Sequence, residues 1–368
     1  MAGSHPILKE GETIDYLVIG GGIAGLSAGA GLAPHGSVVL LEAEDTLGHH
    51  TSGRSAALYE PSYGKPAVQA LGRASYDGLK ATGTLSPRGV MVVGLAGQES
   101  AFEEDVAHMG LTEVTLDEAK ALCPILDTDA ITRAAYLEAV YDIDTDLLMQ
   151  TYAKDIRASG GQVLTRHPVT AITRTADGWT VTAGGTEFTA KHIVNAAGAW
   201  VDEVAEMAGI APIGFTPLRR SMARTPAPDG MDPASWPMIF GAGEGWYVKP
   251  DAGALIVSPA EEDPTEPHDA WADDMILAEG LARFEENVTM EVTRLIANWA
   301  GLRTFAPDRV LVVGPDPLDE KFFWCGGQGG YGFITAPAVR DLVEALVTGR
   351  DPIIGAEHIP ALSPVRFR

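Results

Sequence analysis

The stretch DYLVIGGGIAG at residues 15–25 decides the fold, because an apolar run stops abruptly at three consecutive glycines. The run at 15–19 predicts a buried β-strand, and the small apolar residues at 23–35 are spaced as in a helix. A second apolar run, SVVLLE at 37–42, predicts another buried strand. A strand, a glycine-rich turn, a helix and a strand in this order form a βαβ unit, which indicates a parallel sheet covered on both faces.

The glycines of this turn have the G-x-G-x-x-G spacing of a dinucleotide-binding fingerprint. Gly20 permits the tight turn, Gly22 lets the backbone approach a pyrophosphate, and Gly25 lets the helix pack closely on the strand. The N-terminus of the helix offers amide donors and partial positive charge to phosphates. Glu42, at the end of the second strand, is placed to bind a ribose and to repel a 2′-phosphate. A glycine-rich turn that binds nothing is the simpler alternative, but the context favours a bound dinucleotide.

Composition and charge narrow the class of protein. The chain has 368 residues, more than one hydrophobic core usually serves, so we expect two lobes. With 26 Lys and Arg against 50 Asp and Glu, the net charge of −24 argues against a nucleic-acid partner and against attraction to anionic lipid. Two cysteines far apart in sequence indicate neither a disulfide framework nor a zinc site, and no metal is expected.

The hydropathy pattern predicts no integral membrane segment, because no apolar run reaches about 18 residues. The first residues also lack the apolar core of a secretory signal. We therefore expect a cytoplasmic location.

The rest of the chain mixes helices with short strands. Helical patterns occupy 65–80, 145–159 and 336–347, with Pro337 expected in the first turn of the last helix. Strands are predicted at 179–182, 218–223, 246–249, 254–257, 310–313 and 322–325. We expect an α/β fold with a Rossmann-like βαβ lobe and a second, substrate-binding lobe built on a mainly antiparallel sheet. The first lobe is predicted at 13–84, 146–214 and 302–368, and the second at 85–145 and 215–301.

Three further motifs resemble those of the glycine/D-amino-acid oxidase family of FAD enzymes: HTSGRSA at 50–56, NAAGAW at 195–200 and QGGYG at 328–332. The chain is most similar to bacterial D-amino acid dehydrogenases of the D-arginine dehydrogenase type, which also carry motifs like DIDTD at 142–146 and WAGLR at 299–303. The fingerprint alone suits FAD or NAD, and the resemblance implies FAD.

The motifs also suit a flavin physically. Its wide, planar ring needs backbone close against it, which small residues such as Ser55 and Ala56 allow. Ser52 and Arg54 are polar enough to bind the pyrophosphate or the ribityl chain, and the N-terminus of the last helix would place partial positive charge beside the ring. The residues assigned to FAD are Gly20, Gly22, Ile23, Ala24, Gly25, Glu42, Ala43, Ser52, Arg54, Ser55, Ala56, Val169, Ala197, Gly198, Gly329, Gly330, Tyr331 and Gly332.

The FAD is expected to be bound without a covalent link. His49 and His50 stand close to where one type of relative attaches its flavin through a histidine, which keeps a covalent link as an alternative. Cys325 lies in an apolar run and is predicted to be buried rather than reactive, and Cys123 is also interpreted as structural.

An amino-acid substrate brings a carboxylate, and arginine suits it because the planar guanidinium holds both oxygens and keeps its proton. The candidates are Arg220, on the predicted strand at 218–223, and Arg303. The residues alone leave open whether each is a surface or salt-bridge residue. The resemblance assigns both to the substrate carboxylate, and it matches Tyr247 and Tyr63 to active-site tyrosines, with Tyr63 in a loop over the site.

Departures from the D-arginine dehydrogenase pattern bear on the substrate's side chain. Arginine-specific relatives need a carboxylate at the position of Val90 and have a histidine at that of Leu58. Both changes predict a pocket, which includes Gly330, for neutral or apolar side chains. Glu60 and Glu244 could restore an acidic contact, but surface placement is the simpler expectation.

We therefore predict an enzyme that oxidatively deaminates D-amino acids. Hydride leaves Cα for flavin N5, and the imine is hydrolysed to a 2-oxo acid. No general base is evident, so the rate should rise with pH. The predicted partners are an amino-acid substrate and an electron acceptor, either oxygen or a quinone. The alternatives are oxidation of an N-methyl amino acid or a 2-hydroxy acid, or a protein that binds FAD without turnover.

Overall fold

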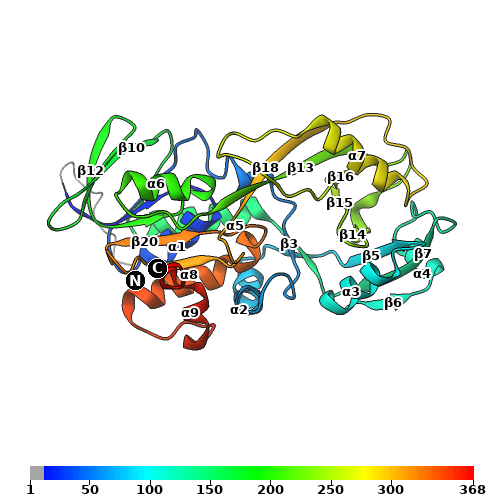
Figure 1. Ribbon diagram of the computed structural model, residues 1–368, viewed down its shortest axis with the longest axis horizontal. Coiled ribbons are helices and arrows are strands. Elements are labelled where there is room, and N and C mark those ends of the chain that lie inside the picture. The colour runs from blue at the N-terminus through cyan, green and yellow to red at the C-terminus, as the bar shows by residue number, and fades with distance from the viewer. Residues whose placement is uncertain (1–11) are drawn as a thin grey trace.

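The computed structural model describes residues 12–368 and has two lobes side by side along its long axis (Figure 1). One lobe contains the N-terminal βαβ unit together with the C-terminal helices. The other is built from two internal stretches of the chain, drawn mainly in cyan and in green to yellow (Figure 1). The predicted two-lobed α/β fold is confirmed.

A mixed sheet forms the centre of the first lobe. Its strands are β1 (Ile14–Ile19), β2 (Val38–Leu41), β9 (Gln162–Leu164), β10 (Val169–Arg174), β11 (Trp179–Ala183), β12 (Thr186–Asn195), β19 (Val312–Pro315) and β20 (Phe322–Gly326). Their order is β10-β11-β12-β1-β2-β9, with β20 and then β19 extending the sheet from β12. Pairing is parallel among β1, β2, β9, β12 and β20, as the βαβ pattern predicts.

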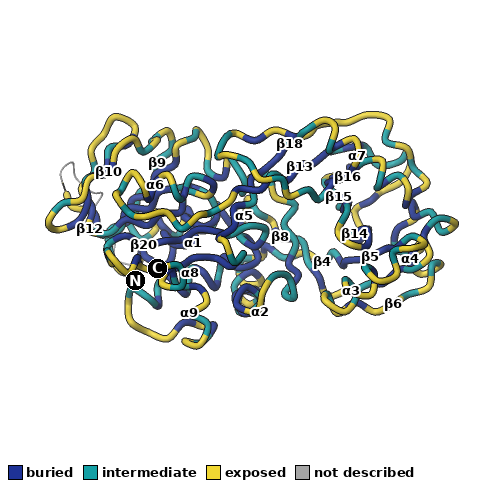
Figure 2. The backbone as a smooth tube through the Cα atoms, viewed as in Figure 1, coloured by how far each residue is buried: buried dark blue, intermediate teal, exposed yellow. Residues whose placement is uncertain are grey.

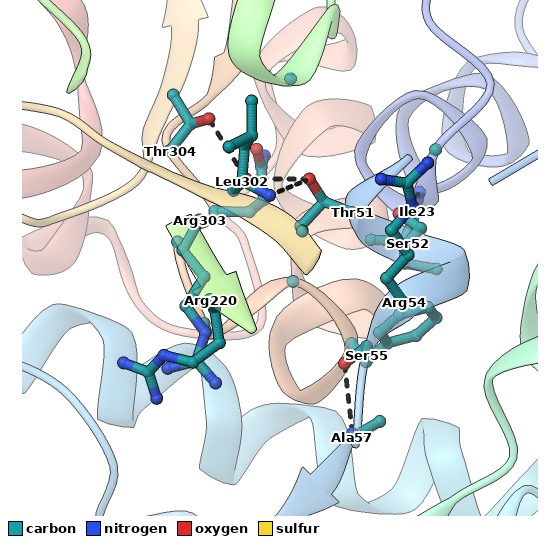
Figure 3. A pocket seen from close by; sticks show the side chains of 18 of the residues that line it. Ile23, Thr51, Ser52, Arg54, Ser55, Ala57, Arg220, Leu302, Arg303 and Thr304 are labelled. Atoms are coloured by element: carbon teal, nitrogen blue, oxygen red, sulfur yellow. Dashed lines mark hydrogen bonds between the residues drawn. The ribbon is translucent and has the colours of Figure 1, made fainter. Parts of the chain in front are cut away.

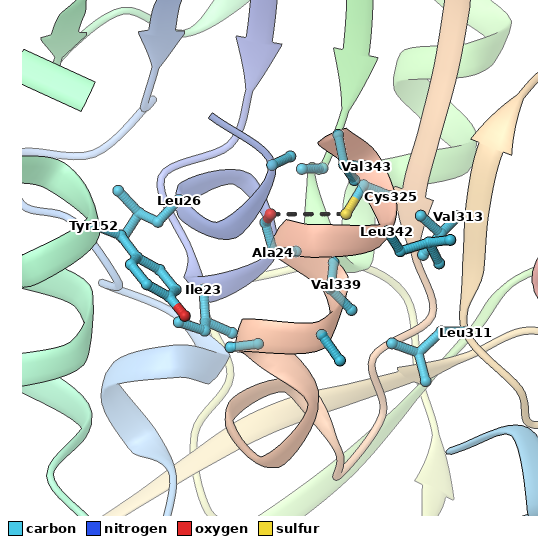
Figure 4. Packing of buried hydrophobic residues seen from close by; sticks show 14 of the residues in the cluster. Ile23, Ala24, Leu26, Tyr152, Leu311, Val313, Cys325, Val339, Leu342 and Val343 are labelled. Atoms are coloured by element: carbon cyan, nitrogen blue, oxygen red, sulfur yellow. Dashed lines mark hydrogen bonds between the residues drawn. The ribbon is translucent and has the colours of Figure 1, made fainter. Parts of the chain in front are cut away.

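Helices cover this sheet. They are α1 (Ile23–Leu32), α2 (Pro66–Ala81), α5 (Thr145–Ala158), α6 (Val201–Met207), α8 (Gly332–Thr348) and α9 (Ile359–Leu362), with 3-10 turns at Thr51–Arg54, Gly198–Trp200, Ala356–His358 and Pro364–Phe367. Every residue of α1 is buried, because its Ala and Gly residues let α5, α8 and the sheet approach closely. Figure 4 shows α8 beside α1, where the Cys325 Sγ lies 3.7 Å from the carbonyl oxygen of Ala24.

Two helix ends differ from the sequence prediction. α8 begins at Gly332 rather than at 336, so Pro337 lies inside the helix instead of in its first turn. Its ring packs against α2 at Gly78, where a Cβ would lie only 2.7 Å from the Pro337 Cβ. Because proline has no N–H, the helical hydrogen bond from position 337 to the carbonyl oxygen of Phe333 is absent, but the proline ring fills the contact between α2 and α8. α1 ends at Leu32, before the predicted end at 35.

The second lobe has a mainly antiparallel sheet, as predicted. Its strands are β5 (Val90–Leu95), β6 (Thr112–Val114), β7 (Ile131–Leu137), β13 (Thr216–Pro226), β14 (Met238–Gly241), β15 (Tyr247–Asp251), β16 (Ala254–Ser258), β17 (Asp263–Pro264) and β18 (Ala297–Phe305). The order is β17-β13-β16-β15-β14-β5-β7-β6, with β18 also on β13, and among the described strands of this sheet only β5 and β14 pair in parallel. The helical segments are α3 (Glu99–Met109), α4 (Leu116–Leu122), α7 (Asp274–Glu285) and a 3-10 turn at Pro233–Ser235.

The lobes meet at a small sheet of β3 (Leu58–Tyr59), β8 (Tyr141–Ile143) and β4 (Leu85–Pro87). Buried backbone runs through both lobes, and the long strands β13 and β18 continue from the junction into the second lobe (Figures 1 and 2). β18 crosses the predicted border between 301 and 302, and the exact segment borders stay a prediction. None of the described helices is long and apolar enough to cross a membrane.

Candidate active site

Three cavities follow one another along the junction of the lobes. The first is lined by the fingerprint turn, and the third by residues of both lobes. The middle cavity shares Gly22, Thr51, Ser52, Ala196 and Gly198 with the first, and Ser55, Ala56, Ala57, Leu58, Arg220, Arg303 and Gly330 with the third. The shared walls indicate one continuous path, and most residues that the sequence assigned to cofactor and substrate line it.

The fingerprint turn leaves room for a ligand only because its side chains are absent. A Cβ on Gly20, which has φ +115°, would lie 2.3 Å from the carbonyl oxygen of Ala196. A Cβ on Gly25 would lie 1.9 Å from the carbonyl oxygen of Gly20, so Gly25 is the close-packing glycine of α1 and β1. In the part of the chain that the structure describes, the amides of Gly22 and Ala24 have no acceptor, and both residues line the middle cavity. Two free donors at a helix N-terminus suit a pyrophosphate.

Glu42 lies at the C-terminal end of β2 and lines the first cavity together with Ala43 and Val169. Its side chain is buried, and its two oxygens accept hydrogen bonds from the amides of Gly21 at 2.8 Å and Glu44 at 2.9 Å. Each carboxylate oxygen can accept a further bond. The residue therefore orders the turn and can also accept ribose hydroxyls, as the fingerprint requires.

The 3-10 turn at Thr51–Arg54 closes one side of the path. Ser52 Oγ accepts a hydrogen bond from the amide of Ile23 at 3.0 Å, which ties this turn to the start of α1. Thr51 Oγ1 donates to the carbonyl oxygen of Leu302 at 2.8 Å, which ties it to β18 (Figure 3). Ser52 thus stands at the pyrophosphate end of the path, where the sequence placed it.

Arg54 lines the middle cavity, but its guanidinium is already engaged by the protein. It donates to the carbonyl oxygens of Ala270 and Ala300, both at 2.7 Å, and it forms an ion pair with Asp269. Its Nε donates to the carbonyl oxygen of His49 at 3.2 Å. The sequence assigned Arg54 to the pyrophosphate or ribityl chain, whereas the structure places its donors across the junction, where they hold the second lobe.

The glycine-rich segment before α8 forms another wall of the middle cavity. Gly329 has φ +48°, and a Cβ there would lie 2.1 Å from the ring of Phe305. Gly330 and Gly332 also line the cavity, and Gly332 is the first residue of α8. The N-terminus of α8 therefore faces the space into which a flavin would fit, with the partial positive charge expected there. Tyr331 lies outside the three cavities, where burial raises its pKa to about 12.

The two predicted arginines meet at the boundary between the middle and third cavities (Figure 3). In the β13–β18 ladder Arg220 opposes Gly301 and Arg303 opposes Leu218, so the arginines are diagonal neighbours on one face of the sheet. Arg220 donates through Nε to the carbonyl oxygen of Glu261 at 2.9 Å and contacts the Glu262 carboxylate at 3.3 Å. Arg303 contacts the Tyr63 hydroxyl at 3.5 Å and has no carboxylate partner among the described residues.

Both guanidinium groups carry positive charge at neutral pH. Burial and the neighbouring Arg303 lower the pKa of Arg220 from its usual value. Burial also acts to lower the pKa of Arg303, but Tyr63, Tyr247 and Glu262 outweigh it and raise this pKa. Two adjacent cations, of which Arg303 has no carboxylate partner among the described residues, create local positive charge that suits an anion in a protein of net charge −24.

The two predicted tyrosines stand on either side of this pair. Tyr247 of β15 is buried, and the Arg220 guanidinium lies 6.0 Å from its ring centroid. Tyr63 lies in the loop before α2, and its hydroxyl would be 3.1 Å from a Cβ on Gly330. Both tyrosines line the third cavity, so the structure brings them to the arginines as expected.

The third cavity differs from the predicted apolar pocket. Leu58 lines it, but Val90 does not, because the sheet order places β14 between β5 and the strands that carry Tyr247 and Arg220. Glu60, expected at the surface, is only 6% exposed and lines the cavity. Glu244 is exposed and also contributes to the wall. These placements correct the expectations for Val90 and Glu60.

Sequence reasoning missed the residues that position Arg220. Glu262 contacts Arg220 and also binds Arg309 through both carboxylate oxygens at 2.9 Å. No local pattern marks Glu262, because its partners are distant in sequence. The DIDTD motif has a structural role here: Asp142 of β8 pairs with Arg88 at 2.6 Å and with Lys249 of β15 at 2.8 Å, and thereby links the junction sheet to the second lobe.

The histidines before the 3-10 turn line the first cavity with Glu44. The ligand atoms of Glu44, His49 and His50 lie within 4.8 Å of one another, a spacing that a metal ion could bridge. His50 Nε2 is already hydrogen-bonded to Glu44 Oε1 at 3.0 Å. This bond accounts for the approach of the two side chains without an ion.

A glycine-rich turn at a helix N-terminus, a continuous path of cavities and a pair of adjacent arginines are together typical of a flavin-dependent oxidoreductase. The chain belongs to the family described as FAD dependent oxidoreductase, whose family model matches residues 15–346. Its cofactor is FAD, and it is an oxidoreductase. The predicted closeness to D-arginine dehydrogenases stays a prediction.

Relatives of the chain act on amino acids according to their names. It is 29% identical to a glycine oxidase of Pseudomonas aeruginosa, over 94% of this chain and 98% of that protein. It is 25% identical to the human mitochondrial dimethylglycine dehydrogenase, over 93% of this chain but only 43% of that longer protein. The crystal structure of glycine oxidase from Geobacillus kaustophilus has the same fold, with a TM-score of 0.80 and 20% identity over 95% of this chain and 98% of that one.

Proposed function

We propose that this protein oxidises the Cα–N bond of a D-amino acid with FAD, so that the products are a 2-oxo acid and ammonia. The observation that carries the proposal is the Arg220–Arg303 pair, in which Arg303 has no carboxylate partner among the described residues. A substrate carboxylate would satisfy both guanidinium groups at the edge of the cavity that suits the flavin.

The chain's own residues bind and orient the substrate. Arg220 and Arg303 would hold the carboxylate, and Tyr63 would limit the access of water from the loop side. The fingerprint turn, Glu42 and the start of α8 would hold FAD, which would supply the acceptor for a hydride from Cα. As the hydride leaves, the amine lone pair forms the C=N bond, and water then hydrolyses the released imine.

The amine must lose a proton before its lone pair is available. None of the residues shared by the middle and third cavities is a histidine or a carboxylate. This absence among the lining residues supports deprotonation by solvent. We therefore expect the rate to rise with pH until the amine of the bound substrate is neutral.

Oxidation of an N-methyl amino acid is the second candidate, and the similarity to human dimethylglycine dehydrogenase favours it. The same arginine pair would hold the carboxylate, but hydride would leave the N-methyl group and formaldehyde would be released. A 2-hydroxy acid would use the same contact without an amine. The cytoplasmic location and the electron acceptor, oxygen or a quinone, stay predictions from the sequence.

Anaerobic mixing of the FAD-loaded protein with single substrates tests the proposal. Loss of the oxidised flavin absorption with D-amino acids, together with one ammonia per flavin reduced, is the expected result. Reduction only by N-methyl amino acids, with formaldehyde as the product, would select the second candidate. A flavin that stays oxidised with every amino acid and N-methyl amino acid would instead support a protein that binds FAD without turnover.

A further inference from the structure

Glu60 is a buried carboxylate with an incomplete set of partners. It is 6% exposed, and its Oε1 accepts hydrogen bonds from the amide of Ser62 at 2.9 Å and from the Ser62 hydroxyl at 2.5 Å. Within the described residues neither oxygen forms an ion pair, and besides Ser62 the backbone amide of Tyr63 acts on the carboxyl group as a hydrogen-bond donor. Buried carboxylates are rarely left unpaired, because removal of their charge from water is costly.

This carboxylate lines the third cavity but not the middle cavity, into which a flavin would fit. Arg220, Arg303 and Gly330 line both the middle and the third cavities, whereas Glu60 lines only the third. The cavity therefore has a cationic end beside the middle cavity and an acidic region away from it.

Two further features make this remote region negative. α3 ends in the cavity wall at Met109, so the partial negative charge of a helix C-terminus lies there. Glu244 adds a carboxylate at the exposed part of the wall, and His108 is the one histidine among the described residues that line the third cavity. Leu58, Met238 and Phe240 line the space between the two ends with apolar groups.

We infer that Glu60 binds a cationic group, a primary ammonium or guanidinium, at the distal end of the substrate's side chain. The substrate class is then an amino acid with two charged ends: its carboxylate lies on Arg220 and Arg303, its methylene groups pack on the apolar wall, and its cation pairs with Glu60. This inference rests on the proposed function for the placement of the substrate carboxylate. The substrate side chain would then be cationic, and not neutral or apolar as the sequence predicted from Val90 and Leu58.

Burial is the main influence on Glu60, and it raises the pKa of this carboxyl group, while the bonds from Ser62 and the nearby His108 act to lower it. A bound cation would favour the ionised form of Glu60 more strongly than the hydrogen bonds from Ser62 alone do. A ligand with a distal cation would therefore gain a charge-assisted hydrogen bond that an apolar ligand of equal length lacks.

The first experiment measures binding without turnover, with the holoenzyme and two carboxylates of equal carbon number. 6-Aminohexanoate and hexanoate are titrated against the visible absorption of the bound FAD. We expect 6-aminohexanoate to have an about tenfold lower Kd, and Glu60→Gln to abolish this difference. Equal Kd values in the wild type, or an unchanged preference in E60Q, would overturn the inference.

Two control variants separate charge from structure. Glu104→Gln removes an exposed carboxylate of α3 that does not line the cavity and should leave both Kd values unchanged. Ser62→Ala removes the hydroxyl bond to Glu60 but keeps its charge, so the preference for 6-aminohexanoate should persist. Loss of the preference in S62A but not in E60Q would assign Glu60 a role in shaping the loop and overturn the inference.

Turnover gives an independent readout through D-lysine and D-norleucine, which differ by the terminal ammonium. We expect E60Q to lower kcat/KM for D-lysine about tenfold or more, chiefly through KM, and to change that for D-norleucine less than twofold. An equal loss for both substrates would instead place Glu60 at the α-amine and overturn the inference. If neither substrate reduces the flavin but the 6-aminohexanoate preference is present, the cation site stands and the proposed function fails.

Discussion

The two ends of the cavity path recognise their ligands by different means. At the dinucleotide end the contacts would come from backbone: within residues 12–368 the amides of Gly22 and Ala24 have no acceptor, and Gly20 and Gly25 allow a close approach that any Cβ would block. At the substrate end the charges come from side chains on β13, β18 and short loops. Backbone recognition requires glycine at fixed spacings, whereas side-chain recognition needs only that the fold bring charges together. We therefore expect binding at the dinucleotide end to be lost when a side chain is added, and binding at the substrate end to be lost when a charge is removed.

The largest effect should follow from an added side chain at the dinucleotide end. Gly25→Val would press into the carbonyl oxygen of Gly20, from which even a Cβ would be only 1.9 Å away, and we expect loss of all bound FAD. Gly72→Ala in α2 is the matched control, because its Cβ would have ordinary contacts of 3.6 Å. The flavin-to-protein absorbance ratio measures both. Normal flavin content in G25V would contradict the backbone-based account of this end.

Removal of a charge at the substrate end should leave the cofactor in place. Arg303→Ala should keep FAD but lower kcat/KM about a hundredfold or more, because the remaining Arg220 would hold the carboxylate alone. Arg224→Ala, which removes an arginine of β13 that pairs with Asp251, is the control and should retain activity. If R303A lost its flavin, or retained full kcat/KM, the division between the two ends would be wrong.

A smaller effect is expected where a side chain serves the dinucleotide end. Glu42→Ala removes the acceptor for the amides of Gly21 and Glu44 and a contact for the ribose, so the Kd for FAD should rise about tenfold. Titration of the apoprotein with FAD, followed by quenching of flavin fluorescence, measures this. Asp45→Ala, which removes an exposed partner of Arg166, should leave the Kd unchanged. An unaltered Kd in E42A would mean that backbone alone holds the cofactor.

The smallest effect is expected for Asp15, an acidic residue that lines neither end of the cavity path. Asp15 accepts hydrogen bonds from Ser37 and pairs with Lys191 at 2.7 Å. Burial acts to raise its pKa, but Lys191 and Ser37 outweigh it and lower the pKa. Its stabilisation is therefore present above the unfolded-state pKa and is lost as the pH falls through the folded-state pKa.

We expect Asp15→Asn to lower the free energy of unfolding by about 1 kcal/mol or less at pH 7, with no change in FAD affinity. Urea denaturation at pH 7 and below pH 3 measures this, and the difference between wild type and D15N should shrink at the lower pH. A difference that grew on acidification would mean that Asp15 is not stabilising in its charged form.

The contrast between the two ends also explains how far the sequence could lead. The fingerprint turn, Glu42 and the first βαβ unit follow from local spacing, and the structure has them as predicted. Arg220 and Arg303 were found through resemblance, because their proximity depends on the β13–β18 register between distant segments. Glu60 and Val90 were misplaced for the same reason: the sheet order and the loop over the cavity decide which side chain reaches the ligand, and neither leaves a local pattern. Arg54 lines the path as expected, but its partners in the second lobe lie over 200 positions away.

The buried cysteine behind the fingerprint helix has a consequence for oxidative damage. Burial raises the pKa of the Cys325 thiol to about 12 and that of Cys123 to about 12, so both stay protonated and react slowly with peroxide. If oxygen reoxidises the flavin, hydrogen peroxide would form in the lobe in which Cys325 packs against α1. A sulfinic acid at Cys325 would need space that α1 occupies, so the low reactivity of this thiol protects the helix that begins at the fingerprint turn.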